Sequence, residues 1–447
     1  MGNGLKQPAD SYMKQKQWLA VALAIIGGAV SPVPAANWPQ WRGPFLNGSS
    51  PEANLPVAWS KTNQLAWAAP LPGKSGATPI VWDDTIFLPS PDPDKNLLLF
   101  CLDRGTGQVR WQKKVAQGDR VVGKNNLASP SAVTDGQKVI CLFGTGDLAA
   151  FDFAGGALWS RNLCREYGQF ANMWQYGASP LLHAGRLYIQ VLQRDPPTYG
   201  HARDDRPSRE SFLLCVDPAT GKDLWRQVRK TDAREESMEA YTTPLPVRVG
   251  ERTEIVVVGA NYVTGHDAEK GDERWRCGGL NRRQNLYWRI ITSPVAGPGL
   301  VYAVGPKRDP LLAIKVGGSG LVTDTQVAWT VNEFTPDVCT PLLYRERLLV
   351  LDGDRQVLTS LNPATGEKQW QGNLGVRETF SASPTGADGK IYCVSEKGTV
   401  VVLEAGPEFK ILATFSLGEG PVMSSIVAAQ GCLFLRTAEN LYCASRR

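Results

Sequence analysis

The residues most able to bind a ligand occur in short segments just ahead of Ser/Thr-Pro pairs or closely similar sequences. Arginine can hold a carboxylate through paired hydrogen bonds, and aromatic rings can stack on a planar group. Together these side chains would suit a planar anionic ligand. The sequence favours the alternative interpretation, in which the rings fill the channel and the charges face water. The candidate residues are Lys124, Asn125, Trp174, Tyr176, Glu239, Tyr241, Trp288, Arg289 and Arg377.

Other kinds of site have little support. His183, His201 and His266 are far apart in the sequence and have no metal-ligand spacing. The segment 352–354 (Asp-Gly-Asp) resembles part of a calcium loop but lacks its terminal bidentate acid, and Asp-Gly is common in turns. The sequence shows no glycine-rich phosphate loop, nucleophile elbow or paired-carboxylate arrangement. We therefore expect no catalytic residue and no metal ligand.

The Ser/Thr-Pro positions recur along the chain at steps of 42 to 64 residues. Repeats of about 40–50 residues are typical of propeller blades, each a four-stranded antiparallel sheet. The pattern predicts an all-β, eight-bladed β-propeller. The loops entering the innermost strands of a propeller converge at one mouth of its channel, so the candidate residues should share one face. The repeating positions are Pro79, Pro130, Pro180, Pro244, Pro294, Pro341, Pro384 and Ser425-Ile426.

Most repeats end in an acidic or amide residue, a turn glycine and a tryptophan. The Asp or Asn can cap its own turn, and the glycine can adopt a positive φ. The tryptophan should begin the outer strand and bury its ring against the neighbouring blade. The positions are Asp103, Gly107 and Trp111; Asp152, Gly156 and Trp159; Asp217, Gly221 and Trp225; Asp267, Gly271 and Trp275; and Asn362, Gly366 and Trp370.

The last repeat ends without an outer strand of its own, whereas residues 65–68 resemble an isolated outer strand containing Trp67. We predict that this strand completes the last blade and closes the ring. An open solenoid would instead leave the end strands unpaired.

One position of the third strand holds a small residue in nearly every repeat, which predicts close packing within each sheet. Three of the nine cysteines, Cys101, Cys215 and Cys443, occupy this position. Because cysteines in apolar strands behave as small buried hydrophobes, we expect mostly unpaired, structural cysteines.

The first 36 residues read as a secretory signal, with Lys14 and Lys16 before a short apolar run and small residues at 33–36. The true start is Met1 or Met13. We expect an exported, periplasmic or extracellular monomer with no transmembrane anchor in the mature chain. The net charge of +5 is spread along the chain and gives little support to nucleic-acid binding. The expected parts are the signal peptide (1–36), an N-terminal extension (37–62) and one propeller (63–447).

The sequence from about residue 37 resembles the PQQ-like repeat β-propellers. The Asp-x-x-Thr-Gly-x-x-x-Trp ending carries this likeness, most clearly at 103–111 and 217–225, with a related form at 362–370. The head of the mature chain, Trp-Pro-Gln-Trp-Arg-Gly-Pro at 38–44, is similar to the leader of an exported branch of these proteins. The resemblance covers residues 37–447.

The resemblance implies two kinds of function. One branch contains quinoprotein dehydrogenases, which hold pyrroloquinoline quinone (PQQ) and calcium. The other contains non-catalytic propellers, including the scaffold subunit of the outer-membrane β-barrel assembly machinery. This chain has neither the adjacent cysteines of many alcohol-oxidising members nor a Cys-x-x-Cys-His haem motif. It also departs from the scaffold subunit, because it has no lipid-attachment cysteine and has an insertion at 194–210.

These observations favour a non-catalytic, exported scaffold that binds another protein of the cell envelope and needs no cofactor. The alternatives are a PQQ- and calcium-dependent dehydrogenase of alcohols or sugars, and a glycan-binding propeller. The insertion Arg194–Glu210 is either a charged surface loop or a docking element for the partner.

Overall fold

The computed structural model describes residues 1–2 and 36–446, except 61–62, 198–207, 308 and 334. The chain divides into Met1–Pro34 and Ala35–Arg447, and the fold described below is that of the second unit. The expected signal peptide, residues 1–36, lies outside the described residues except at its ends. Among the described residues, no helix has both the length and the apolar character needed to cross a bilayer.

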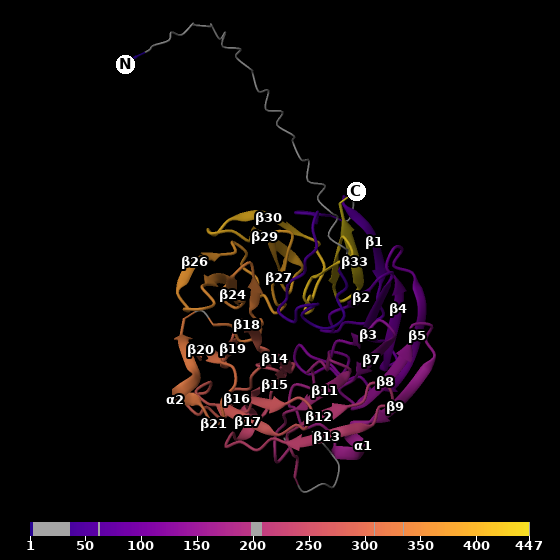
Figure 1. Cartoon of the computed structure of the whole chain (residues 1–447). Helices are drawn as coiled ribbons and strands as arrows, with labels where there is room; N and C mark the ends of the chain where they lie inside the picture. Colours follow the sequence, from indigo (N-terminus) through magenta and orange to yellow (C-terminus); the bar gives the residue numbers. More distant parts are fainter. Residues whose placement is uncertain (3–35, 61–62, 198–207, 308, 334, 447) are drawn as a thin grey trace. The chain divides into compact units, whose positions relative to one another are not determined.

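Eight antiparallel sheets stand around a central axis, which confirms the predicted eight-bladed β-propeller (Figure 1). Nearly all the innermost strands begin directly after a residue of the Ser/Thr-Pro series. In chain order, the first four blades are β2 (Ile80–Trp82), β3 (Thr85–Pro91), β4 (Asn96–Asp103) and β5 (Val109–Gln117); β6 (Val133–Thr134), β7 (Lys138–Leu142), β8 (Asp147–Asp152) and β9 (Ala157–Asn162); β10 (Leu181–His183), β11 (Arg186–Val191), β12 (Phe212–Val216) and β13 (Asp223–Val228); and β14 (Leu245–Val249), β15 (Arg252–Gly259), β16 (Tyr262–Asp267) and β17 (Glu273–Cys277).

Blade 8 combines strands from both ends of this unit. The remaining blades are β18 (Val295–Gly297), β19 (Leu300–Val304), β20 (Leu311–Lys315) and β22 (Val327–Val331); β23 (Leu342–Tyr344), β24 (Arg347–Asp352), β25 (Val357–Leu361) and β26 (Lys368–Asn373); β27 (Thr385–Ala387), β28 (Lys390–Val394), β29 (Thr399–Glu404) and β30 (Ile411–Ser416); and β31 (Val427–Ala429), β32 (Cys432–Arg436), β33 (Asn440–Ser445) and β1 (Leu65–Pro70).

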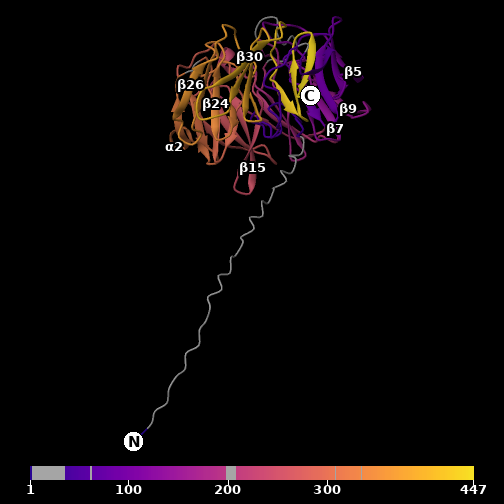
Figure 2. The same ribbon diagram turned by 90° about the horizontal axis from the view of Figure 1, so that it is seen from above.

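Short additional elements decorate this ring. The helices α1 (Leu163–Tyr167), η1 (Glu235–Met238) and α2 (Thr323–Gln326) lie in connections between strands. Strand β21 (Gly320–Leu321) adds to blade 4 in parallel with β17. The β14–β15 hairpin extends beyond its neighbours on one side of the ring (Figure 2).

Strand β1 closes the ring as predicted. It pairs antiparallel with β33, and Trp67 lies opposite Cys443. Arg436 of blade 8, fully buried, also binds blade 1, donating hydrogen bonds to the carbonyls of Pro89 and Gly73 at 2.7 and 3.2 Å. A continuous apolar cluster that includes Phe100 and Phe434 fills the space between these two blades.

The outer-strand tryptophans dock on the following blade. The indole N–H of Trp67 donates to the carbonyl of Arg104, and its ring covers Gly107, whose φ is +73°. In blade 2 the positive φ falls at Gly155 rather than at Gly156. The same indole-to-carbonyl bond, 2.9–3.2 Å long, joins Trp111 to Phe153, Trp159 to Pro218, Trp329 to Pro363 and Trp370 to Gly406.

Two tryptophans depart from the expected pattern. Trp329 occupies the outer-strand position of blade 5, but the sequence pattern missed it because the chain between β20 and β22 is longer and lacks the Asp-x-x-Thr-Gly turn. Trp275 consequently has no such turn to dock on in blade 5. Its indole N–H binds Glu254 of its own blade at 2.7 Å.

The register explains the small position in the third strand. In seven blades the small residue lies directly opposite the outer-strand tryptophan, so that the large ring packs over a short side chain. In blade 7 the outer strand has Ala413 in place of tryptophan, and the third strand has the larger Val402 opposite it. The seven pairs are Cys101–Trp111, Ala150–Trp159, Cys215–Trp225, Gly265–Trp275, Ala313–Trp329, Ser360–Trp370 and Cys443–Trp67.

A pair of glycine substitutions tests whether tryptophan docking holds the ring together. Gly107 and Gly185 have similar φ values of +73° and +71°, but an added Cβ would lie 2.5 Å from the Trp67 ring at Gly107 and in open space at Gly185. Gly185→Ala should cost about 1–2 kcal/mol through backbone strain alone. Gly107→Ala should cost about 1–3 kcal/mol more through the clash. Chemical unfolding of both variants measures the difference, and equal losses would contradict the docking role.

Candidate functional site

A cavity of about 520 Å³ occupies the channel at the end where the loops enter the innermost strands. All eight blades contribute lining residues, among them Gly76 of blade 1, Thr243 of blade 4 and Met423 of blade 8. Its volume is in the range of ordinary small-molecule or peptide pockets. The propeller geometry therefore converts eight separate sequence segments into one site.

A belt of hydroxyl groups from the Ser/Thr-Pro segments joins neighbouring blades around this cavity. Each hydroxyl accepts a hydrogen bond from a backbone N–H of the adjacent blade. These N–H groups are buried and have no partner in a neighbouring strand, so the hydroxyl supplies the acceptor they need. This contact gives the recurring Ser/Thr a structural role. The bonds, 2.8–3.3 Å long, run from Thr78 to Ser131, Ser131 to Ser179, Thr243 to Ser293, Ser293 to Thr340, Thr340 to Ser383 and Ser425 to Thr78.

The segment 36–56, which we call the floor segment, crosses the inside of the ring (Figure 1). Its Trp41 lines the cavity and forms its floor. The Gln40 amide forms a reciprocal pair with the backbone of Leu182 in blade 3, at 3.0 and 3.2 Å. On the other side of the ring, Ser50 donates to the carbonyl of Gly386 in blade 7. The segment thus connects opposite blades through hydrogen bonds to their innermost strands.

Arg42 anchors the floor from inside the protein. Its guanidinium is buried and donates to the carbonyls of Pro341, Pro384 and Asn47 at 2.8–3.1 Å. Burial lowers the pKa of Arg42 to about 9. Since these carbonyls come from blades 6 and 7 and from the floor segment itself, one side chain fixes three backbone segments.

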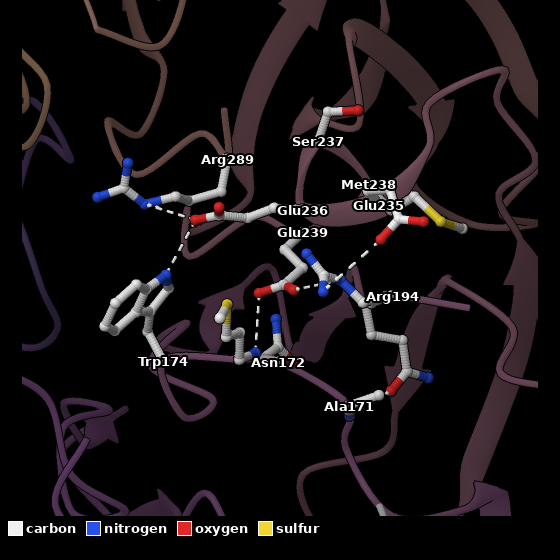
Figure 3. A network of polar contacts seen from close by, with 12 residues as sticks. Ala171, Asn172, Trp174, Arg194, Glu235, Glu236, Ser237, Met238, Glu239 and Arg289 are labelled. Atoms are coloured by element: carbon white, nitrogen blue, oxygen red, sulfur yellow. Dashed lines mark hydrogen bonds and ion pairs between the residues drawn. The ribbon is translucent and has the colours of Figure 1, made fainter. Parts of the chain in front are cut away.

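One wall of the cavity is built by a polar and charged network on the loops that lead into blades 3 to 6 (Figure 3). Glu236 in η1 accepts a hydrogen bond from the indole N–H of Trp174 at 2.9 Å and lies 3.5 Å from the Arg289 guanidinium. Arg289 also contacts Asp337 of the next loop at 3.4 Å. These contacts fix the orientation of Trp174, whose ring remains 36% exposed.

Glu239 connects the same wall to the base of the insertion. It is fully buried and accepts hydrogen bonds from the backbone N–H of Met173 at 2.9 Å and the hydroxyl of Tyr241 at 2.6 Å. Its other oxygen lies 3.2 Å from Nε of Arg194 (Figure 3). Burial raises the pKa of Glu239 to about 7, although the Tyr241 hydroxyl opposes this shift by stabilising the charged form.

The structure brings five of the nine predicted residues to the cavity: Lys124, Asn125, Trp174, Tyr241 and Arg289. The other four lie elsewhere. Tyr176 is buried in the wall, where its hydroxyl donates to the carbonyl of Gln190, and Glu239 is buried behind Tyr241. Trp288 is partly buried and Arg377 is exposed, and neither lines the cavity.

Several lining residues were missed by sequence reasoning. Trp41 belongs to the head segment whose Trp-Pro-Gln-Trp-Arg-Gly-Pro pattern was noticed, but nothing in that pattern shows that it enters the channel. Asp337 and Phe380 lie in segments before Pro341 and Pro384, so the rule that selected the other candidates could have found them. Asp354 follows β24 and reaches the cavity from a different loop.

The sequence matches the family described as outer membrane protein assembly factor BamB over residues 50–193, 320–407 and 354–444. These segments cover more than half of the chain. The chain belongs to this family. Membership confirms the PQQ-like repeat propeller inferred from the repeating motif.

Solved structures of this family and of other propellers share the fold. BamB from Moraxella catarrhalis is 14% identical with a TM-score of 0.57, covering 85% of this chain and 99% of its own. Quinohemoprotein alcohol dehydrogenase from Comamonas testosteroni is 11% identical with a TM-score of 0.62, covering 92% and 81%. At these identities the likeness shows the fold alone. No curated protein matches the sequence.

The charged residues that line the cavity balance one another, since the cations Lys124 and Arg289 are matched by the anions Asp337 and Asp354. Lys124 and Arg289 also already contact the carboxylates of Glu396 and Asp337. Across the described parts of the chain, His, Cys, Asp and Glu side chains do not gather in threes in a way that could hold a metal ion.

The buried position of Glu239 predicts a specific pH dependence. Because its pKa rises from about 4.5 in the unfolded chain to about 7 in the folded protein, the folded state binds more protons between these values. The free energy of unfolding should therefore fall as pH rises through this window. Titration of Glu239 accounts for on the order of 3 kcal/mol of this fall. The variant Glu239→Gln, whose residue 239 does not titrate, should lack that part of the fall.

Thermal or chemical unfolding from pH 4.5 to 8 measures this contribution. Glu235→Gln is the control, since Glu235 lies in the same segment near Arg194 but is about half exposed. It should leave the pH dependence unchanged. Identical pH profiles for the wild-type protein and Glu239→Gln would contradict the assignment.

Proposed function

We propose that this chain is an exported, non-catalytic propeller that binds another protein of the cell envelope through the mouth of its channel. Membership of the BamB family supports a scaffold role. The expected signal peptide supports export, and the propeller acts as a monomer. The observation that carries the proposal is a set of exposed apolar side chains at the mouth.

These side chains lie on the two loops that lead into blades 3 and 5. Trp174 is 36% exposed, Leu286 40% and Tyr287 65%. Large aromatic side chains at the surface are enriched at the centre of protein interfaces, because they bury much apolar area with few rotatable bonds. Trp174 is held in place by Glu236 before any partner arrives, so its binding costs less conformational entropy.

The chemistry of the cavity also favours binding over catalysis. Its lining consists of hydroxyls, aromatic rings and two opposite pairs of charges, and within the described residues it includes no histidine or cysteine. The hydroxyls of Ser131, Ser179 and Ser383 accept backbone hydrogen bonds from neighbouring blades. These bonds use the three hydroxyls to support the channel wall.

A photo-crosslinking amino acid at position 287 tests the binding face. We expect a discrete adduct with one envelope protein when the chain is expressed in its own cell. The matched control is the same amino acid at Leu158, which is 48% exposed but lies on the outer strand of blade 2. Equal crosslinking from both positions, or none from position 287, would contradict the proposal.

Substitutions then measure the contribution of each side chain. Tyr287→Ser should weaken binding of the captured partner roughly tenfold or more, as expected for an aromatic anchor. Leu158→Ser should change the affinity less than about twofold. Titration of the purified proteins by calorimetry provides both values.

The non-catalytic part of the proposal has its own test. After incubation with PQQ and calcium, the purified chain should retain no PQQ, because the cavity has no excess of cations. Retention of PQQ together with dye reduction on addition of alcohols or sugars would overturn this part and favour a dehydrogenase.

A further inference from the structure

Two cysteines lie close together in the blade that closes the ring. Cys432 begins β32 and pairs with Ser445, while Cys443 in β33 pairs with Phe434. Because alternate residues of a strand share a face, both thiols point to the same side of blade 8. They are diagonal neighbours on adjacent antiparallel strands, which places the two side chains next to each other on that face.

The shared face packs against blade 1. Cys443 lies opposite Trp67 of the closing strand, and the rings of Trp67 and Phe434 are 6.0 Å apart. Both cysteines belong to the apolar cluster between blades 8 and 1. The pair therefore sits at the seam where the two ends of the propeller meet.

Cys432 differs from most of the other cysteines in its surroundings. It is only partly buried, and the neighbouring Cys443 thiol and Arg104 guanidinium lower its pKa despite partial burial. The same proximity raises the pKa of Cys443 strongly. Burial raises the pKa of six others: Cys101, Cys141, Cys215, Cys277, Cys339 and Cys393. An accessible thiolate beside a second thiol is the arrangement found in redox-active cysteine pairs.

We propose that Cys432 and Cys443 form a reversible disulfide that links β32 to β33 at the ring seam. The oxidant is a small-molecule or protein disulfide. The Cys432 thiolate attacks one sulfur of that disulfide, forms a mixed disulfide and releases the first oxidant thiolate. Cys443 then attacks the Cys432 sulfur, transfers its proton to the departing sulfur and releases the second oxidant thiol. Two protein thiols are oxidised, and one oxidant disulfide is reduced to two thiols.

This bond does not depend on the proposed function. It stiffens the pair of strands β32 and β33, and β33 in turn pairs with the closing strand β1. The bond therefore stabilises the ring where its last blade meets its first blade. In a reducing environment the pair returns to thiols, and the covalent link between β32 and β33 is lost.

The test counts free thiols in the full chain. The protein is incubated with oxidised glutathione, denatured with an alkylating agent and measured by mass spectrometry. We expect two of the nine cysteines to resist alkylation, and a peptide map without reductant should show Cys432 linked to Cys443. The oxidised protein should unfold at a higher temperature than the reduced protein. Nine alkylated cysteines, or glutathione on Cys432 with Cys443 free, would overturn the proposal.

Two variants make the result specific. Cys443→Ala should fold, because blade 2 has Ala150 at the equivalent position opposite its tryptophan, and it should trap glutathione on Cys432. Cys164→Ser is the matched control, since Cys164 is also only partly buried but lies in α1. It should keep the Cys432–Cys443 link. Loss of the link in Cys164→Ser would also count against the assigned pair.

Discussion

The contact of an outer-strand tryptophan with the turn of the next blade is the constraint on which the structure depends. Each sheet buries its faces only by packing on its neighbours, so a blade has no stable position alone. The indole ring covers a turn glycine, and its N–H binds a carbonyl of the same turn, as Trp67 does with Gly107 and Arg104. Apolar area gives no preferred angle between two sheets, whereas this directed bond fixes how one blade meets the next at five junctions, those of Trp67, Trp111, Trp159, Trp329 and Trp370. Opposite each such tryptophan, the third strand keeps a small residue, which is why cysteine is frequent there.

Closure of the ring and closure of the channel use the same N-terminal region. Strand β1 completes blade 8, and the segment before it crosses the channel and holds opposite blades through Gln40 and Arg42. The same N-terminal region thus supplies the outer strand of blade 8 and brings Trp41 to the channel. The result is a cavity at the mouth of the channel, lined on its inner side by a tryptophan.

The mouth is asymmetric although the blades repeat. The loops into blades 3 to 5 carry η1, the Glu236–Arg289 contact and the buried Glu239, whereas the loops into blades 6 to 8 are shorter. Burial of Glu239 costs free energy at neutral pH, but its hydrogen bonds join two loops and the base of the insertion. The exposed side chains of Trp174 and Tyr287 belong to the loops that form this wall of the cavity. Repetition thus provides the framework, and departures from repetition provide the surface to which we assign binding.

The sequence by itself determined the eight blades, the closing strand and the face on which the loops gather. These features follow from periodicity, since each repeat carries its own strands, turn and tryptophan. The sequence also selected five residues of the cavity, because position before a Ser/Thr-Pro pair predicts position at the mouth. Only the tertiary structure decided that Trp41 forms the floor, that Glu239 is buried and Arg377 exposed, and that Cys432 meets Cys443. These facts depend on contacts between segments far apart in the chain, or on the direction of one side chain in a loop, and neither leaves a periodic signal in the sequence.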